Sequence, residues 1–367
     1  MKIMSVFGTR PEAIKMCPVV KEIQKRCGVE SVVCLTGQHK EMLEPVMQLF
    51  DLQEDYNLQI MRPNQTLSNI TSDILMKLDE VMEFEKPDIV LVHGDTSSSF
   101  AAALSAFYHH IPIGHVEAGL RTYNMQAPYP EEFNRQAVDL ITDLYFAPTL
   151  HARKQLVKEG KVAEKIFVTG NTVIDSLKTT VDKNYYNEDL TWCDNSKMIL
   201  LTAHRRENIG KPMENIFEAI VRIVEKFPKV KVLYPIHKNP KVREIAYRYF
   251  KNNEQVRLIE PLDVYDFHNF MNRSYLILTD SGGIQEEAPA LGKPVLVLRD
   301  TTERPEGVEA GTLKVVGTKT DTICAAVENL LMNEAEYAKM AKASNPYGDG
   351  FASKRIVDII EDYFREK

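Results

Sequence analysis

Three carboxylates stand where predicted secondary-structure elements begin or end. Asp95 directly follows a predicted strand at 88–93, Glu117 directly follows another at 113–116, and Glu131 begins a predicted helix. Parallel strands joined by a right-handed crossover end at the same edge of a sheet, so we expect Asp95 and Glu117 to meet there. Closely placed carboxylates push one pKa upward, which supplies a proton donor and a base in one site. The set therefore predicts acid–base chemistry.

Glu131 has a second interpretation. An acidic residue in the first turn of a helix also stabilises the helix dipole without any catalytic role. Arg135 lies on the same predicted helix face at spacing i, i+4. We keep Glu131 as a candidate because three carboxylates from separate loops around one crevice are harder to explain as dipole partners.

Two basic residues bracket the start of the first predicted helix. The chain turns at Gly8 after the first strand, and Pro11 is tolerated in a first helical turn, where its missing N–H costs nothing. Arg10 and Lys15 can both point at an anion held at this helix N-terminus. A helix cap with two solvated basic side chains is the alternative interpretation.

The second half of the chain places a histidine and arginines directly after a predicted strand at 197–202. His204 and Arg205 suit a dianionic phosphate, because a guanidinium binds phosphate oxygens through charge-assisted hydrogen bonds. His237 follows the next strand and is expected at the same edge of the sheet. A histidine that fills a partly buried strand end explains His237 equally well.

The segment 280–288 carries the most specific signal. A strand stops, Gly282 and Gly283 let another backbone or ligand approach closely, and a helix begins with exposed N–H groups. This pattern predicts a pyrophosphate cradle without a P-loop lysine, with Ser281 before the glycines and Arg304 as a phosphate partner. Glu287 is placed to accept hydrogen bonds from ribose hydroxyls. If the two glycines only form a tight turn, the segment is structural.

The elements that position these residues are short β-branched runs alternating with longer stretches of helical period. This alternation predicts an α/β chain of two Rossmann-like, doubly wound domains. We expect an N-terminal domain at 1–170, a C-terminal domain at 171–350 and a last helix within 351–367 that returns to the first domain. The predicted strands are 2–7, 30–35, 88–93, 113–116, 144–147 and 165–168 in the first half, and 197–202, 231–235, 256–259, 275–278, 295–298 and 313–316 in the second.

Composition and missing motifs exclude several classes of protein. The 367 residues carry a net charge of −7, and no basic run interleaved with aromatics could follow a phosphate backbone, so we expect no nucleic-acid partner. No apolar run approaches the roughly 20 residues that cross a bilayer, and the N-terminus lacks signal-peptide features. The scattered cysteines indicate a reduced, cytoplasmic protein. The sequence lacks the zinc-protease, P-loop and dinucleotide-binding motifs.

These motifs together resemble the non-hydrolysing UDP-N-acetylglucosamine 2-epimerases of bacteria. The matching stretches are FGTRPEAIKM at 7–16, HGDT at 93–96, HVEAGLRT at 115–122, PEEFNR at 130–135, HRREN at 204–208 and DSGGIQEEA at 280–288. The resemblance implies a GT-B-like arrangement of the two domains with the active site in the interdomain cleft. It also implies a homodimer that needs no cofactor and no metal.

Matched position by position, the resemblance implies roles for individual residues. Asp95, Glu117 and Glu131 resemble the catalytic carboxylates of the family, and His204 resembles its essential histidine. Phe267 resembles the residue beside the uracil ring. The remaining substrate-binding residues implied are Arg10, Lys15, Arg135, Arg205, His237, Ser281, Gly282, Gly283, Glu287 and Arg304.

The expected reaction interconverts UDP-GlcNAc and UDP-ManNAc and supplies ManNAc units for surface polysaccharide. The C2 proton of the sugar is not next to a carbonyl, so a base removes it while UDP leaves from C1, and UDP then adds back to the glycal. A GT-B glycosyltransferase, a hydrolysing epimerase, a nucleotide-sugar sensor and an epimerase for a modified UDP-sugar are the alternatives.

A second substrate molecule activates many members of the family, and this chain departs from that site. Gln38, Glu131, Arg205 and His237 match that site. Glu41 and Asn64 differ from it, because they stand where a glutamine and an arginine are common. An added acidic residue and a lost arginine both weaken anion binding. We therefore expect a hyperbolic rate curve.

Overall fold

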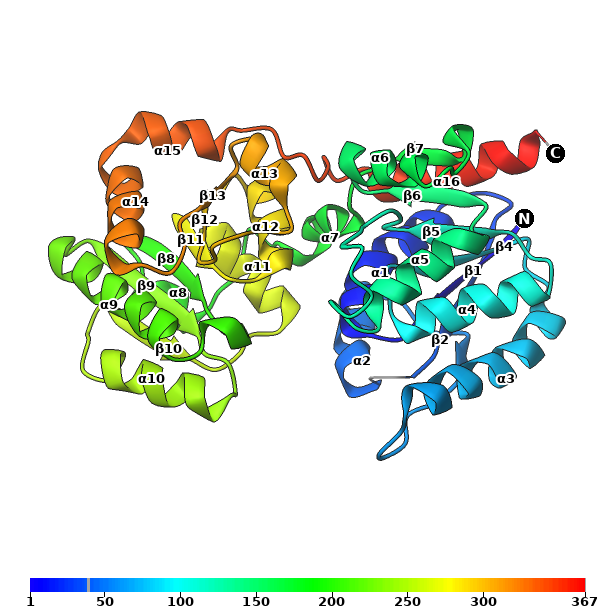
Figure 1. Ribbon diagram of the computed structural model, residues 1–367, viewed down its shortest axis with the longest axis horizontal. Coiled ribbons are helices and arrows are strands. Elements are labelled where there is room, and N and C mark those ends of the chain that lie inside the picture. Colours follow the sequence, from blue (N-terminus) through cyan, green and yellow to red (C-terminus); the bar gives the residue numbers. More distant parts are fainter. Residues whose placement is uncertain (38–39, 367) are drawn as a thin grey trace. The chain divides into compact units, whose positions relative to one another are not determined.

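The chain forms two compact units in the computed structural model (Figure 1). The structure describes residues 1–37 and 40–366, and at 40–42 it describes the backbone alone. Unit 1 comprises Met1–Thr179 together with Tyr347–Lys367, and unit 2 comprises Thr180–Pro346. Within the described ranges no helix is both long and apolar enough to cross a membrane.

Unit 1 is built on a seven-stranded parallel sheet with the strand order β3-β2-β1-β4-β5-β6-β7. Its strands are buried apolar runs covered on both faces by helices, as parallel sheets require. The strands are β1 (Lys2–Phe7), β2 (Glu30–Leu35), β3 (Tyr56–Asn57), β4 (Ile89–His93), β5 (Ile113–Val116), β6 (Leu144–Ala147) and β7 (Ile166–Val168).

The helices of unit 1 pack on this sheet through amphipathic faces. Met4 and Val6 of β1 pack with Ile74 and Leu78, one turn apart on α3. The helices are α1 (Arg10–Gln24), α2 (Lys40–Leu49), α3 (Leu67–Glu85), α4 (Ser97–Tyr108), α5 (Glu131–Ile141), α6 (Leu150–Lys158), α7 (Thr172–Thr180) and α16 (Ala352–Arg365). A 3₁₀ turn covers Ala163–Lys165.

Unit 2 repeats the plan with a six-stranded parallel sheet in the order β10-β9-β8-β11-β12-β13. The strands are β8 (Lys197–Thr202), β9 (Val230–Pro235), β10 (Val256–Ile259), β11 (Leu276–Thr279), β12 (Val295–Val297) and β13 (Leu313–Val315). The helices are α8 (Glu188–Trp192), α9 (Lys211–Lys226), α10 (Pro240–Phe250), α11 (Val264–Arg273), α12 (Gly282–Glu287), α13 (Pro305–Glu309), α14 (Thr320–Met332) and α15 (Glu334–Ala341).

Helix α9 shows how the sequence produces this packing. Its buried side chains Ile216, Ile220 and Ile223 recur every three or four residues and form one apolar face against the sheet. Short 3₁₀ turns at Arg206–Asn208 and Ala288–Leu291 complete the unit.

Both sheets reverse their winding direction beside the first strand of the unit. β1 lies between β2 and β4, and β8 lies between β9 and β11. At such a switch point the loops after the two central strands diverge and leave a crevice at their carboxyl ends. Asp95 follows β4, while His204 and Ser281 follow β8 and β11.

The predicted α/β architecture is confirmed. Every predicted strand is present with each end within one residue of its predicted position, and the last helix predicted within 351–367 is α16. The two-residue strand β3, which pairs with Cys34 and Leu35 of β2, was not predicted. Two residues are too short to show an alternating or apolar pattern.

Candidate functional site

The carboxylate of Glu117 contacts three side chains at the sheet edge of unit 1. Its Oε2 atom accepts hydrogen bonds from the Lys15 ammonium and, at 3.0 Å, from Asn171 Nδ2. The ring of His93, at the end of neighbouring β4, places Nε2 3.7 Å from the same oxygen. The side chain of Glu117 is only 11% exposed, so the hydrogen bonds from Lys15 and Asn171 replace most of its hydration.

The backbone of Glu117 is in the left-handed region, with φ of +67°. A non-glycine residue there costs about 1 kcal/mol, and such conformations concentrate at functional sites. The N–H groups of Glu117 and Ala118 both donate to the carbonyl of Phe146 on β6, at 3.1 and 3.2 Å, which holds the turned segment in place.

Asp95 lies on the neighbouring loop and is held differently. Its Oδ2 forms an ion pair with the Arg135 guanidinium at 2.6 Å, and its backbone carbonyl accepts a hydrogen bond from Asn134 Nδ2 at 2.9 Å. Glu132 is fully buried and lies 3.6 Å from Arg135, and it also accepts from two backbone N–H groups after β5. Arg135 therefore forms ion pairs with both Asp95 and Glu132.

The two carboxylates have opposite pKa shifts. Burial raises the pKa of Asp95; the Arg135 guanidinium opposes this rise and the charge of Glu117 adds to it. Burial alone would raise the pKa of Glu117 as well, but the Lys15 ammonium and the His93 ring hold it well below its usual range. The edge thus carries one firmly ionised carboxylate beside one that takes up a proton more readily.

The other residues of unit 1 that were predicted for the site lie on α1 and α5. Glu131 is half-buried in the first turn of α5, and Arg10 is exposed as the first residue of α1. Lys15, predicted to face an anion beside Arg10, contacts Glu117. The structure therefore brings together Asp95, Glu117, Lys15 and Arg135.

Sequence reasoning gave no role to three residues at this edge. His93 is 4% exposed, and among the described residues neither of its ring nitrogens has a hydrogen-bond partner. His115 is fully buried and bonded at both ring nitrogens. His93 and His115 belong to the HGDT and HVEAGLRT motifs, which could have marked them as site residues. Asn171 lies in none of the motifs, so no sequence pattern marked it.

In unit 2 the buried carboxylate of Asp280 organises the loop after β8. Its Oδ2 accepts from the backbone N–H groups of His204 and Arg205, both at 2.9 Å, and from Asn208 Nδ2 at 3.0 Å. Three donors on one buried oxygen fix the direction of this loop. Asp280 is the residue that positions His204, whose Nδ1 lies 3.6 Å from the other Asp280 oxygen.

His204 and His237 form a stacked pair of rings with centroids 5.3 Å apart and planes at 9°. Both histidines are exposed. Partial burial and the neighbouring His204 ring lower the pKa of His237. The structure thus brings together the two histidines that were predicted to lie at one edge of the sheet.

The Ser-Gly-Gly segment begins α12 beneath two guanidinium groups. A Cβ added at Gly282 would lie 3.8 Å from a terminal nitrogen of Arg205 and 3.8 Å from one of Arg304. Arg304 bonds to Glu286, and Arg205 lies 3.7 Å from the half-exposed Glu303. A carboxylate oxygen of Glu303 lies 4.0 Å from the same position, so the two guanidinium groups, with a nearby carboxylate, are the groups that suit a phosphate here.

The two residues predicted for the nucleoside lie on α12 and α11. Glu287 Oε2 is 3.4 Å from Nε2 of the buried His268, whose Nδ1 contacts Thr180 Oγ1 at 2.6 Å. Phe267 is half-buried and packs against the apolar core of unit 2. His268, which steadies Glu287, was not predicted.

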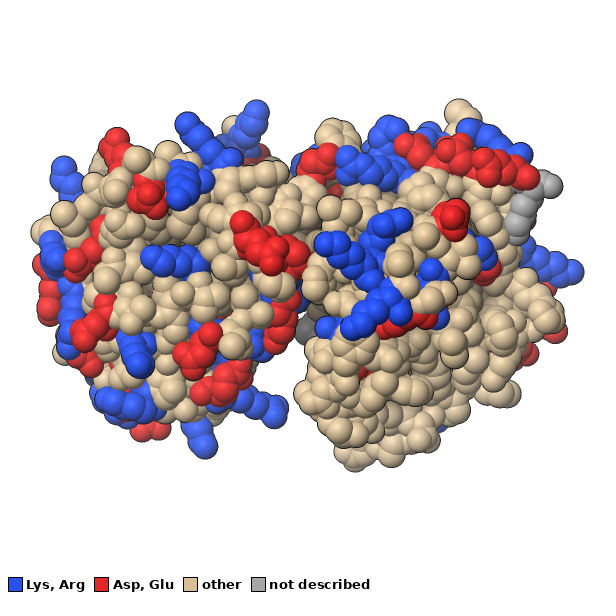
Figure 2. All heavy atoms as spheres, turned by 45° about the horizontal axis from the view of Figure 1, so that its top comes forward, with Lys and Arg blue, Asp and Glu red and all other residues tan. Residues whose placement is uncertain are grey.

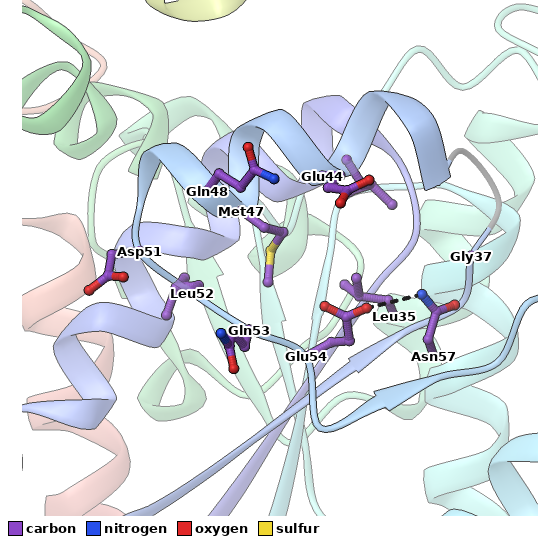
Figure 3. Close-up of a pocket in the computed structure, with 11 residues that line it drawn as sticks. Leu35, Gly37, Glu44, Met47, Gln48, Asp51, Leu52, Gln53, Glu54 and Asn57 are labelled. Atoms are coloured by element: carbon purple, nitrogen blue, oxygen red, sulfur yellow. Dashed lines mark hydrogen bonds between the residues drawn. The ribbon is translucent and has the colours of Figure 1, made fainter.

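A pocket of about 550 Å³ lies in unit 1 between α2 and the end of β2 (Figure 3). Its lining includes Glu44, Asp51 and Glu54, and Asn57 Nδ2 donates to Glu54 at 3.3 Å. The described lining residues thus include three carboxylates and no basic side chain, a composition that disfavours an anionic ligand.

The predicted activator residues are only partly described. Gln38 lies outside the described residues, and the side chain of Glu41 lies outside them as well. Asn64 is exposed in a turn with φ of +57°. Across the residues described, no group of histidine, cysteine and acidic side chains could hold a metal ion.

Two doubly wound sheets, one with nearly buried carboxylates and the other with arginines above a glycine-rich helix start, are typical of enzymes that act on nucleotide-linked substrates. The family model described as UDP-N-acetylglucosamine 2-epimerase matches residues 21–361. The chain belongs to the UDP-N-acetylglucosamine 2-epimerase family, whose members are isomerases.

Relatives match over nearly the full length. The UDP-N-acetylglucosamine 2-epimerase of Bacillus subtilis is 59% identical, covering 98% of this chain and 95% of the relative. The structure of S. aureus MnaA with UDP is 54% identical with a TM-score of 0.89, covering 99% and 97% of the two chains. That of the Neisseria meningitidis epimerase bound to UDP-GlcNAc is 49% identical with a TM-score of 0.87, covering 99% and 100%.

Proposed function

We propose that this protein interconverts UDP-GlcNAc and UDP-ManNAc by eliminating UDP and adding it back. The observation that carries the proposal is the pair Asp95 and Glu117, adjacent at one sheet edge with opposite pKa shifts. The relative solved with UDP-GlcNAc and the one solved with UDP support the same substrate class for this chain. The full conversion leaves no net change in protons, and no redox cofactor is needed.

In this proposal, residues of unit 1 remove and deliver the proton at C2 of the sugar. Asp95 is the carboxylate whose raised pKa suits it to take and give a proton, because an acid–base group works best when its pKa approaches the working pH. Glu117 remains ionised beside Lys15 and stabilises positive charge that develops on the sugar as UDP departs. Glu131 is the remaining carboxylate for the opposite face of C2.

The proposal assigns the uridine diphosphate to unit 2. Arg205, Arg304 and the N–H groups at the start of α12 bind the pyrophosphate, and His204 stands beside it to stabilise the leaving oxygen. Glu287 receives the ribose hydroxyls and Phe267 lies beside the uracil. The UDP and the glycal then recombine, with a proton delivered to the opposite face of C2.

Proton NMR of the purified protein with UDP-GlcNAc in deuterated water tests the proposal. We expect UDP-ManNAc with deuterium at C2, without any added cofactor. Substrate returned without deuterium and without released UDP would contradict it. Release of UDP with free ManNAc would instead identify a hydrolysing epimerase.

The glycosyltransferase alternative shares the unit 2 features but has no use for the unit 1 carboxylates. A transferase consumes UDP-GlcNAc only when an acceptor is present, so turnover of UDP-GlcNAc alone separates the two. An epimerase for a modified UDP-sugar would show low kcat/KM on UDP-GlcNAc. The proposed role in the cell is the supply of ManNAc units for surface polysaccharide.

We also propose that unit 1 associates with a second copy of the chain. Helix α4 contains no charged residue and exposes Phe107 and Tyr108, while the adjoining α3 exposes Met76 and Phe84. Figure 2 shows a broad face of unit 1, at right, with few charged side chains. Apolar surfaces of this kind mark protein interfaces. Light scattering after size exclusion tests this, with a monomeric mass as the contrary outcome.

A further inference from the structure

His115 is a buried histidine whose two ring nitrogens are both engaged. It lies on β5 with no exposed surface. Nδ1 is 2.7 Å from Asp139 Oδ1, and Nε2 is 2.8 Å from the carbonyl oxygen of Gly94. The carbonyl oxygen of Gly94 can only accept a hydrogen bond, so Nε2 of His115 donates it.

Asp139 is in turn fixed by a basic residue. Arg121 donates to Asp139 Oδ2 at 2.6 Å, and both side chains are fully buried. Arg121 also forms two hydrogen bonds of 2.7 Å with Glu159. Breaking a buried chain of charges is costly, and its positions are therefore narrowly defined.

The network ends on the loop that carries Asp95. Gly94 precedes Asp95, and its N–H donates to Val116 at 2.9 Å while its carbonyl accepts from His115. Glu117 lies two residues beyond His115, directly after the end of β5. His115 thus links the loop of Asp95 to the strand that leads into Glu117.

We propose that His115 is a positioning residue for epimerisation, which sets the separation of Asp95 and Glu117 by holding the Gly94 carbonyl against β5. This inference rests on the proposed function of the two carboxylates. A displacement of about 1 Å in such a pair lowers the rate about 100-fold without weakening substrate binding. The hydrogen bond to Gly94, more than the one to Asp139, is the essential contact.

Two substitutions separate the two hydrogen bonds of His115. The amide of a glutamine reaches about as far as Nε2 of histidine, and that of an asparagine about as far as Nδ1. We expect His115→Gln to keep the bond to Gly94 and lose about 10-fold in kcat, and His115→Asn to lose about 100-fold. KM for UDP-GlcNAc and the affinity for UDP should change less than twofold in both.

A matched control removes a neighbouring buried hydrogen bond. The hydroxyl of Tyr145 donates to the backbone carbonyl of Asp139 at 2.9 Å, and Tyr145 is 4% exposed. Tyr145→Phe should lower the melting temperature to an extent comparable with His115→Gln yet leave kcat unchanged. Equal losses of kcat in Tyr145→Phe and His115→Asn, or equal losses in the two His115 variants, would overturn the proposal.

An additional measurement needs no substitution. Nitrogen-15 NMR of histidine-labelled protein should show one ring whose Nε2 carries a hydrogen protected from exchange, and the absence of that N–H would overturn the proposal. If the unaltered protein leaves UDP-GlcNAc unchanged, the proposed function fails. If it epimerises while both His115 variants keep full kcat, the positioning role alone fails.

Discussion

The candidate groups of the two units differ in how firmly the protein holds them. In unit 1, Lys15 and Arg135 are 17% and 12% exposed, and each makes a close ion pair with a carboxylate. In unit 2, Arg205 is 31% exposed, and its carboxylate neighbours lie at 3.6 and 3.7 Å. The first arrangement is organised before any ligand binds, whereas in the second Arg205 is available to a ligand and only Arg304 is held closely, by Glu286.

This difference follows the chemistry proposed for each unit. Proton transfer at carbon needs groups fixed to within a fraction of an ångström, and burial with ion pairing supplies that precision. Binding a pyrophosphate needs accessible charge that exchanges a loose partner for the ligand. In the proposed reaction, the charged side chains of unit 1 orient the proton-transfer groups, and those of unit 2 bind the pyrophosphate.

The largest effect is expected from replacing either central carboxylate by its amide. Asp95→Asn and Glu117→Gln should each lower kcat by about 10³-fold or more, because a proton-transfer group or a fixed charge is lost. UDP affinity measured by calorimetry should stay within about twofold, since the phosphate residues are untouched. Weakened UDP binding with unchanged turnover at saturation would reverse the roles of the two units.

The second test compares a buried ion pair with an exposed one. Asp139→Asn leaves the buried Arg121 with one carboxylate partner fewer, and we expect a loss of about 3 kcal/mol in the free energy of unfolding. Glu303→Gln, at a half-exposed contact, should cost less than about 1 kcal/mol. Urea unfolding measures both. Similar losses of unfolding free energy in the two variants would show that ion pairs are held equally firmly in the two units.

The third test concerns capture of the anion. Arg205→Gln should weaken UDP binding about 10- to 100-fold, the loss expected for a charge-assisted hydrogen bond. Its kcat should change little. Arg248→Gln, which removes a half-exposed arginine from an ion pair with Glu214, is the control and should bind UDP normally. A fall in kcat with unchanged affinity would place Arg205 in the chemistry instead.

The fourth test is a pH profile. Arg135 opposes the rise in the pKa of Asp95, so Arg135→Gln should raise that pKa further. A higher pKa leaves less ionised Asp95 at low pH, and the acid limb of kcat/KM should therefore move to higher pH. Arg135→Lys keeps the charge and should move the limb less. An unmoved acid limb in both variants would show that Asp95 does not control it.

The smallest expected effect concerns activation by a second substrate molecule. With Glu41 and Asn64 in place of neutral and basic residues, the initial rate should rise hyperbolically with UDP-GlcNAc concentration. A sigmoidal curve would indicate that substrate also binds at an activating site. The double substitution Glu41→Gln with Asn64→Arg then tests whether those two positions suppress activation.

The sequence predicted the sheets well because buried parallel strands are continuous apolar runs with clear ends. The positions of Asp95 and Glu117 followed from the strand ends alone. The partners did not, because Lys15 reaches Glu117 from a helix 102 residues away in the chain. Arg135 was placed on the face of Glu131 by spacing, whereas its close contact is Asp95 on another loop.

The buried histidines His93 and His115 were given no role from the sequence. Exposed His204 was selected because arginines follow it, while His93 and His115 were passed over inside apolar strands. In a strand the alternation of side chains gives only the face, and the bonding partners of a buried imidazole depend on the neighbouring strands. The role of Asn171 depends in the same way on a contact with Glu117 that crosses 54 residues.

The return of α16 to unit 1 has a consequence for synthesis on the ribosome. Unit 2 is one continuous stretch, whereas unit 1 takes its last helix from the end of the chain. Ile356, Val357 and Ile360 of α16 are fully buried, and Arg26 at the end of α1 pairs with Asp358. Domains tend to fold in the order in which they emerge, yet here unit 2 is complete before unit 1. The surface of α1 that α16 covers must therefore stay exposed until α16 has emerged after unit 2.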